Sequence, residues 1–401
     1  MSRRSAATPL PREVGVLALI AFVVALGFGV VVPAIPLFAR SYGVGTTAVG
    51  LAVSAFALFR FVSAFAGGAL VDRLGERLVL TAGLVVVAVS TGLAALAGNF
   101  PLFVALRAVG GIGSAMFTVA ALSLLLRSAP ADQRGRATAA FQGGFVLGGI
   151  AGPAAGGFLA ELSPRLPFFL YSGFLLAAGL VSAGLLSRAP GPPPGGRVGP
   201  GGPEGPAADG GLRAALRSRV YLAALVANLG VGWMLFGVRS SLVPLYVTEE
   251  LGKSVAWAGA GLLVGSVAQA VALLRAGRLA DTWGRRPALV LGTALTTSSI
   301  AALAFPPGTA VFLLSMGTLG LGASLLSSVP AALVGDVSPR QGGRAVAVFQ
   351  MVADLGAVAG PLVAGWLTDR AGYQAAFGVS AGVLGLALVA ALAMPRVPRR
   401  A

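Results

Sequence analysis

Asp354 is the one acidic residue that lies deep inside a long apolar stretch of this sequence. An ionised carboxylate near the centre of a membrane helix costs about 2.5 to 3.5 kcal/mol on insertion scales, so such a residue needs a function or a partner. The chain has no His and no Cys. Imidazole acid/base catalysis, thiol nucleophiles, disulfides and His- or Cys-containing metal sites are therefore excluded. We expect no enzyme activity, no metal site and no cofactor.

Three arginines, Arg60, Arg107 and Arg239, also lie within apolar stretches. Each carries the same insertion cost, so each needs a partner, a cavity or a ligand. A fourth, Arg275, lies near the end of its stretch, where a long side chain reaches the membrane interface. The chemistry of this chain thus rests on one carboxylate and a few guanidinium groups.

The composition indicates a membrane protein. Of 401 residues 56% are hydrophobic and 10% are charged, whereas soluble domains carry about 25% charged residues. The formal net charge is +16, but the basic residues sit almost entirely between long apolar runs, where they orient a protein in a bilayer. We therefore expect the lipid bilayer, and not nucleic acid, as the partner of this charge.

About 20 apolar residues are needed to cross the hydrocarbon core, and twelve runs of that length occur. The N-terminal run has no small-residue cleavage site, so we expect it to be a first span and not a signal peptide. The expected spans are 14–37, 47–70, 78–97, 102–126, 137–160, 167–187, 220–247, 255–280, 287–305, 309–334, 345–367 and 373–394.

The basic residues also predict the orientation. Of the 29 Lys and Arg residues, 21 fall on the side of the N-terminus and four on the other side. Because cytoplasmic loops are enriched in Lys and Arg, we expect a multi-pass protein of the cell (inner) membrane with both termini in the cytoplasm.

The chain divides into two related halves. Residues 188–219 are rich in Pro and Gly, which is typical of a flexible connector. We expect a six-helix bundle over 1–187, a cytoplasmic linker over 188–219 and a second six-helix bundle over 220–401. A shift of 208 residues superposes RATAAFQGGFVLGGIAGP on RAVAVFQMVADLGAVAGP, with Arg, Phe, Gln and the final Ala-Gly-Pro matching. Six-plus-six parallel repeats are a transporter architecture, with a substrate site between the halves.

Short polar segments follow the second and eighth spans, GALVDRLGERLVL and GRLADTWGRRP. Both resemble G-x-x-x-D-R-x-G-R, the cytoplasmic signature of the major facilitator superfamily, and the chain is most similar to its twelve-span drug:proton antiporters. Glu76 and Thr282 depart from the pattern. The resemblance implies an all-α fold of two pseudo-symmetric bundles around a central cavity. It also implies gating roles for Gly68, Asp72, Arg73, Gly75, Arg77, Gly277, Asp281, Gly284 and Arg285.

The signature residues have physical roles in helix packing, in turns and in helix capping. Gly68 and Gly277 allow close helix approach, and Gly75 and Gly284 suit tight turns. Asp72 is expected to cap the start of span eleven near Arg344, and Asp281 the start of span five near Arg136. A charged loop that only sets topology is the alternative.

Span five resembles the antiporter-associated pattern G-x-x-x-G-P-x-x-G-G. The residues that match it are Gly148, Gly152, Pro153, Gly156 and Gly157. Such small residues let helices pack backbone to backbone, and Pro153 withholds an amide. Helix packing without any link to antiport is the alternative.

The resemblance implies the remaining site residues. Arg107 matches a fourth-helix arginine that faces the cavity, although it could instead tie helices together through backbone carbonyls. Span two lies beside span eleven in the family, so Arg60 is the expected partner of Asp354, either in proton coupling or as a static ion pair. The candidate cavity residues are Arg107, Arg239, Asn228, Trp233, Phe236, Gln142 and Gln350, with Gln269 nearby.

These observations predict a monomeric secondary transporter that works by alternating access and exports amphipathic organic molecules. The proton gradient is its expected energy source, with Asp354, Arg60 and Arg107 as proton-coupling candidates. Exporters of this group often carry an acidic residue in the first helix, and this chain has none there. An uptake or exchange carrier for an organic anion or another small metabolite is therefore the alternative.

Overall fold

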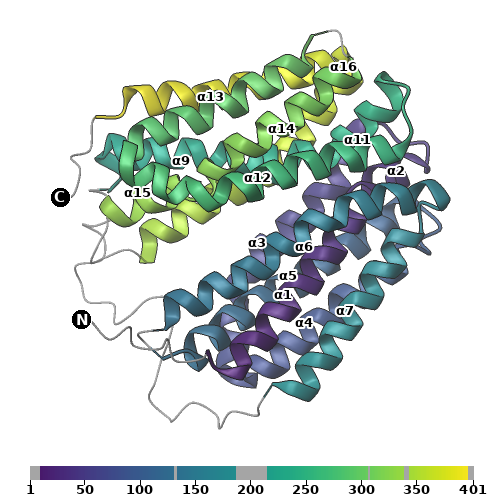
Figure 1. The fold of residues 1–401 in the computed structure, drawn as a ribbon. Helices are drawn as coiled ribbons and strands as arrows, with labels where there is room; N and C mark the ends of the chain where they lie inside the picture. The colour runs from purple at the N-terminus through teal and green to yellow at the C-terminus, as the bar shows by residue number, and fades with distance from the viewer. Residues whose placement is uncertain (1–9, 131–132, 187–214, 306–307, 338–342, 396–401) are drawn as a thin grey trace.

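The two halves of the sequence form two helical bundles that lie against each other, as the computed structural model in Figure 1 shows. The expected linker 188–219 falls almost wholly outside the described residues. The residues that the structure describes are 10–130, 133–186, 215–305, 308–337 and 343–395.

The first bundle contains six membrane spans, the first of which is broken. Its helices are α1 (Arg12–Val31), α2 (Ala34–Arg40), α3 (Thr46–Leu74), α4 (Glu76–Ala94), α5 (Phe100–Ser128), α6 (Arg134–Leu162) and α7 (Leu166–Leu185).

The second bundle repeats this order, and its first span is broken more extensively. Its elements are α9 (Arg219–Val231), η1 (Gly232–Val238), α10 (Arg239–Ser241), α11 (Val243–Leu245), η2 (Tyr246–Glu250), α12 (Val255–Trp283), α13 (Arg285–Leu303), α14 (Thr309–Leu326), α15 (Val329–Val337) and α16 (Gly343–Ala393).

Twelve spans are present within the described residues. Ten helical stretches are long and apolar enough to cross a membrane by hydropathy alone. One of them, within α16, holds two expected spans, which Gly372 separates with its left-handed φ of 82°. The remaining span, α13, has the lower mean hydropathy that its basic start and its Thr-Thr-Ser-Ser segment impose.

The expected first and seventh spans are not single continuous helices. In the first, α1 gives way to α2 at Val32 and Pro33. In the seventh, two π-helical segments, η1 and η2, flank Arg239. Proline within a helix removes a backbone donor, and π-helical turns occur frequently at functional sites. Prediction from apolar runs missed these breaks because proline and glycine do not interrupt hydropathy.

The ends of the spans define two faces of the molecule. We call the face that carries the ends of the described chain, together with the α3–α4 and α12–α13 turns, the termini face. The opposite face, with the α2–α3 and η2–α12 connections, is the distal face.

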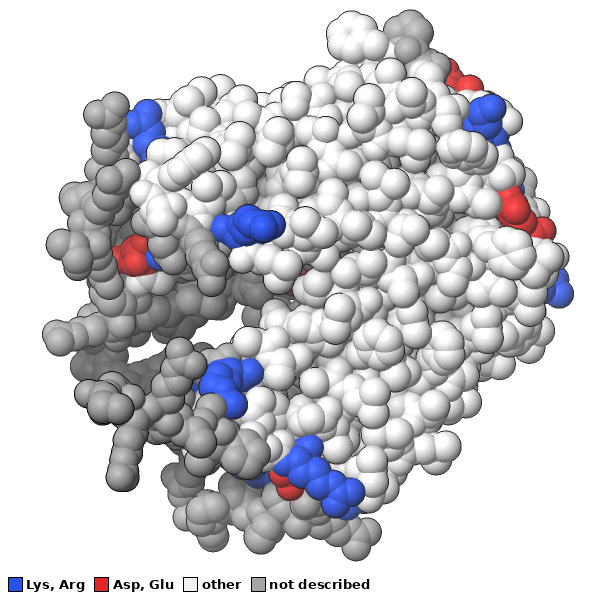
Figure 2. All heavy atoms as spheres, viewed as in Figure 1, with Lys and Arg blue, Asp and Glu red and all other residues white. Residues whose placement is uncertain are grey.

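The halves meet near the distal face and separate toward the termini face. Contacts between them run along α3 and α16 and along α6 and α12. One buried apolar core joins the first bundle to the distal part of the second, whereas a separate core fills the termini-face end of the second bundle. Figure 2 shows a hollow between the halves on the termini face. The described conformation is therefore closed on the distal face and open on the termini face.

Candidate functional site

Arg60 and Asp354, which belong to opposite halves, form an ion pair. The Arg60 Nη2 atom lies 3.1 Å from Asp354 Oδ1, between α3 and α16. The two side chains are 38% and 26% exposed. The structure thus brings together the two residues that the sequence analysis paired, and it leaves both of them accessible.

This pair lies where α3 and α16 begin to separate. On its distal side the helices touch, since Ser54 Oγ donates to Val358 O at 2.7 Å. On its termini side α3 exposes large side chains, including Phe65, which is 67% exposed. An ion pair at this branching point responds to any change in the angle between the halves.

Arg107 is buried in the first half and does not contact an acidic residue among the described ones. Its guanidinium lies 4.6 Å from the centre of the Phe56 ring, and its Nε is 3.5 Å from Ala52 O. Cation–π contact and a backbone carbonyl therefore hold this cation against α3. This arrangement matches the alternative that the sequence left open, in which Arg107 ties helices together.

Arg239 lies between the two π-helical segments and reaches another helix of its own half. Its Nη2 donates to Ser266 Oγ of α12 at 3.2 Å. Within the described residues this guanidinium forms no ion pair, and the Ser266 hydroxyl is its hydrogen-bond partner.

Two of the expected cavity residues serve helix packing instead. Asn228 is buried and donates from Nδ2 to Phe349 O at 2.6 Å, which joins α9 to α16. Trp233 is also buried and donates from Nε1 to Ser380 Oγ at 3.1 Å. A buried polar group that has found a protein partner is a weak candidate for contacting a substrate.

The other expected cavity residues are more accessible. Phe236 is 57% exposed. Gln142 and Gln350, which are related by the internal repeat, are both exposed, and Gln269 is partly buried. Gln350 precedes Asp354 by one helical turn, so the two share a face of α16.

The two signature segments form the expected tight turns. Gly75 and Gly284 have φ values of 82° and 103°, a backbone conformation that side chains disfavour. After each turn an arginine binds a backbone carbonyl within its own half: Arg77 Nη2 donates to Ala183 O, and Arg286 Nη2 donates to Leu392 O. Gly75 and Gly284 thus each occupy a turn that connects two spans.

The cytoplasmic latch expected from Asp72 and Asp281 is not formed by any contact among described side chains. Asp72 is exposed at the end of α3. The side chains of Asp281 and Arg344 lie outside the described part of the structure, as do the surroundings of Gly277, while Arg136 is exposed. The latch therefore stays a prediction for a conformation in which the termini face closes.

The packing role expected of Gly68 is wrong for this conformation. A Cβ atom added at Gly68 would meet no atom within 4 Å. The reason is that the termini-face end of α3 lies away from the other half here.

Two ion pairs near the same turns were not predicted from the sequence. Arg127 Nη2 lies 2.8 Å from Glu76 Oε2, and Arg285 Nε lies 3.3 Å from Asp336 Oδ2. A shift of 209 residues maps Glu76 onto Arg285 and Arg127 onto Asp336. The departure at Glu76 is thus compensated by a cation at position 127. Opposite charges at repeat-related positions were the signal that could have revealed it.

The small-residue pattern of α6 packs as expected. A Cβ atom added at Gly152 would lie 2.6 Å from Gly29 Cα, and one added at Gly157 would lie 2.9 Å from Gly259 Cα. Gly148 and Gly156 likewise lie against the α1 backbone. The pattern therefore joins α6 both to α1 in its own half and to α12 in the other half.

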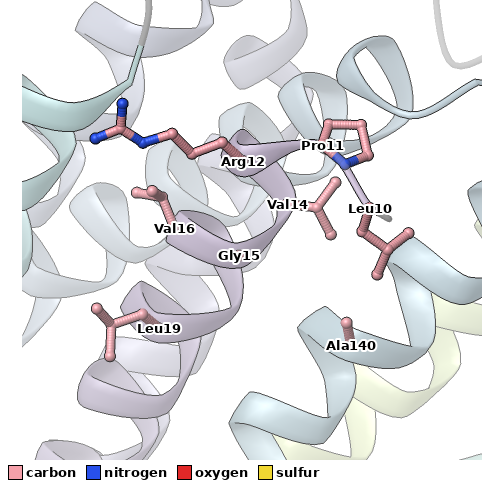
Figure 3. A pocket seen from close by; sticks show the side chains of 8 residues that line it. All are labelled: Leu10, Pro11, Arg12, Val14, Gly15, Val16, Leu19 and Ala140. Atoms are coloured by element: carbon pink, nitrogen blue, oxygen red, sulfur yellow. The ribbon is translucent and has the colours of Figure 1, made fainter. Parts of the chain in front are cut away.

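A small apolar pocket of about 410 Å³ lies apart from these charged residues. It is formed mainly by the start of α1, with Ala140 of α6 (Figure 3). Its lining contains one charged side chain, Arg12, and none of the expected cavity residues. This pocket is not the predicted substrate site.

The fold and site together define a class of protein: a membrane transporter of two six-helix bundles, in which charged residues of both halves meet between the two faces. The sequence profile of the Major Facilitator Superfamily matches residues 17–265 and 231–401. The chain belongs to this family. It is a multi-pass transporter of small molecules and not an enzyme.

Its relatives include resistance proteins. The chain is 32% identical to the quinolone resistance protein NorA of Staphylococcus aureus (strain MRSA252) over 169 residues, which are 41% of this chain and 42% of NorA. That match thus spans less than half of the relative. It is 26% identical to multidrug resistance protein 1 of Bacillus subtilis (strain 168) over 381 residues, 93% of this chain and 94% of the relative.

Solved structures share the fold. A bacterial homologue of the human lysosomal transporter Spinster, in an inward-facing and unoccupied conformation, has a TM-score of 0.79 at 16% identity and covers 95% and 96% of the two chains. A D-xylose-proton symporter has a TM-score of 0.76 at 18% identity, with 97% and 99% covered. The human organic anion transporter MFSD10 has a TM-score of 0.66 at 21% identity, with 95% and 100% covered. The expected all-α fold is confirmed.

Proposed function

We propose that this protein is a proton-coupled antiporter that exports amphipathic organic compounds across the cell membrane. The observation that carries the proposal is the Arg60–Asp354 ion pair, which joins the two halves at the point where they separate. No other acidic residue lies deep in an apolar span of the sequence.

The ion pair gives the coupling a physical basis. An ionised Asp354 holds Arg60, and this is the arrangement in the conformation that opens on the termini face. A protonated, neutral Asp354 loses the charge attraction and releases Arg60. Proton and substrate would then favour opposite conformations, as exchange requires.

The direction of transport follows from the proposed orientation. If the termini face is cytoplasmic, as the excess of basic residues predicts, the described conformation is open to the cytoplasm. Asp354, having released its proton there, would leave the site ready for a substrate from inside the cell. The same proposal places both termini and the linker 188–219 in the cytoplasm and gives the protein a monomeric state.

The class of substrate is supported by the relatives. The names of two of them refer to resistance to quinolones and to multiple drugs. Large apolar side chains on α3 and Phe236 are exposed, as are Gln142 and Gln350, and amphipathic compounds need both apolar and polar contacts of this kind.

Reconstituted vesicles under an imposed pH gradient test the proposal. Internal pH would be followed while lipophilic cations, neutral amphiphiles and organic anions are added in turn. We expect cations or neutral amphiphiles to drive proton movement in the wild type, and Asp354→Asn to abolish it. Asp336→Asn is the matched control, because Asp336 pairs with Arg285 inside one half. Unchanged proton movement in Asp354→Asn would refute the coupling role.

A second candidate function is a carrier of organic anions. The observation that favours it is that neither Arg107 nor Arg239 has an acidic partner among the described residues. One solved relative of the same fold is described as an organic anion transporter. Proton-independent flux of anions alone in the same vesicles, lost in Arg239→Gln, would move the assignment to this class.

A further inference from the structure

Two carboxylates on the distal face reach across the interface between the halves. Asp369, near the end of the first segment of α16, accepts hydrogen bonds from Thr46 N at 2.7 Å and Thr47 N at 2.8 Å. The Thr47 hydroxyl also donates to Asp369 Oδ2, at 2.6 Å. Asp369 of the second half therefore caps the start of α3 in the first half.

Glu161 makes the reciprocal contact. It lies at the end of α6 in the first half and accepts a hydrogen bond from Ala256 N of α12 at 3.1 Å. The side chain of Ser254, which precedes α12, lowers the pKa of the same carboxylate. A shift of 208 residues maps Glu161 onto Asp369, and a shift of 209 maps the start of α3 onto the start of α12.

The backbone beside each carboxylate is packed in the same way in both places. Gly50 of α3 lies against the backbone of Pro361, and Gly259 of α12 lies against the backbone of Pro153. Gly50 and Gly259 are related by the 209-residue shift, and the two prolines by the 208-residue shift. The molecule thus holds two copies of one junction, each made of a carboxylate, a helix start, a glycine and a proline.

We propose that Glu161 and Asp369 are a paired distal latch that holds the distal face closed while the termini face is open. A carboxylate at a helix N-terminus is stabilised by the helix dipole and by charge-assisted hydrogen bonds. Both contacts join opposite halves, so both must break when the distal face opens. Their free energy therefore favours the described conformation over its counterpart.

The two copies differ in strength. Asp369 accepts three hydrogen bonds across the interface and Glu161 accepts one from a backbone amide. The Arg40–Glu249 ion pair, at 2.9 Å, adds a third contact between the halves nearby. The contact made by Asp369 is therefore the stronger of the two contacts that form the latch.

Spin-label distances test the latch, and the absence of cysteine lets labels be placed freely. Labels at Leu96→Cys and Phe305→Cys would lie on the distal loops of the two halves, at repeat-related exposed positions. We expect Asp369→Asn to raise the ratio of distal-open to distal-closed molecules by about tenfold, and Glu161→Gln by about threefold. Asp369→Glu, which keeps the charge, should restore most of the closed population.

Glu250→Gln is the matched control, because Glu250 is a distal-face carboxylate that binds Gln374 of its own half. It should leave the distances unchanged. If Asp369→Asn and Glu161→Gln give the same distances as this control, the latch does not exist. Because distances are measured without substrate or proton gradient, this result is independent of the proposed antiport.

If Asp369→Asn gives too little folded protein for distance measurements, thiol labelling provides a second test of the latch. Ser54→Cys places a thiol inside the distal junction between α3 and α16, and a membrane-impermeant thiol reagent reaches it only when the distal face opens. Faster labelling from the distal side in folded Asp369→Asn molecules supports the latch, and an unchanged rate overturns it.

Discussion

The two halves of this transporter are alike where helices pack and where carboxylates join the halves on the distal face, and they differ in the charges that lie within the spans. Gly152 and Gly360 both bring a helix backbone against the first span of their own half, and Glu161 and Asp369 both reach the opposite half. Asp354, by contrast, has Val146 at its repeat-related position. Residues that are alike at repeat-related positions would then serve the motion of the halves during alternating access, and residues without a counterpart would serve coupling and recognition.

The ion pairs beside the signature turns show a third relation, in which the geometry is kept and the charges are reversed. Glu76 pairs with Arg127 in the first half, whereas Arg285 pairs with Asp336 in the second. What is retained is an attraction that ties two helices together, and either polarity supplies it. A residue that departs from a family pattern is therefore best interpreted together with the residue that it contacts.

The largest expected effect tests the shared packing. Gly152→Leu and Gly360→Leu should each lower the free energy of unfolding by about 3 kcal/mol, since the added side chain would have to displace a helix backbone. Gly149→Leu is the matched control in α6, because nothing lies within 4 Å of a Cβ there. Thermal unfolding in detergent measures all three. Equal stability of Gly152→Leu and Gly149→Leu would break the comparison.

A smaller effect is expected from the reversed ion pairs. Glu76→Arg places two cations together and should cost about 2 kcal/mol, because the Glu76 side chain is only 9% exposed. Adding Arg127→Glu should recover most of this loss by copying the polarity of the second half. Thermal unfolding of the single and double variants gives the coupling energy. Additive losses would mean that polarity, and not attraction, is what the first half requires.

The smallest effect concerns Asn228, whose repeat-related residue is Ile20. Asn228→Ile removes the hydrogen bond to Phe349 O and should cost about 0.6 to 1.7 kcal/mol, the usual range for such bonds between membrane helices. Unfolding measurements check the stability, and substrate binding provides a second measurement. Weaker substrate binding at unchanged stability would indicate that Asn228 contacts substrate in the cavity.

Much of the fold could be predicted from the sequence because hydropathy, basic loops and glycine turns act locally. The twelve spans and the turns at Gly75 and Gly284 follow from such signals. The partnership of Arg60 with Asp354 followed from the family's helix order together with the scarcity of intramembrane charge.

Other features depend on the angle between the halves, which no local pattern encodes. The open space beside Gly68 and the cap that Asp369 places on α3 exist only because this conformation is closed on one face. The packing of Arg107 on Phe56 depends on a side-chain conformation. The π-helical segments around Arg239 likewise lie within one apolar run that reads as a continuous helix.

The most direct test compares two activities: exchange of labelled for unlabelled substrate without a pH gradient, and accumulation of substrate driven by a proton gradient. It shows whether Asp354 couples transport to protons, while the residues shared by the two halves serve the conformational change. In Asp354→Asn vesicles we predict that exchange continues near the wild-type rate while proton-driven accumulation is lost. If both activities disappear together in a protein that folds normally, the Arg60–Asp354 pair is part of the moving framework. If both persist, the coupling proton binds elsewhere.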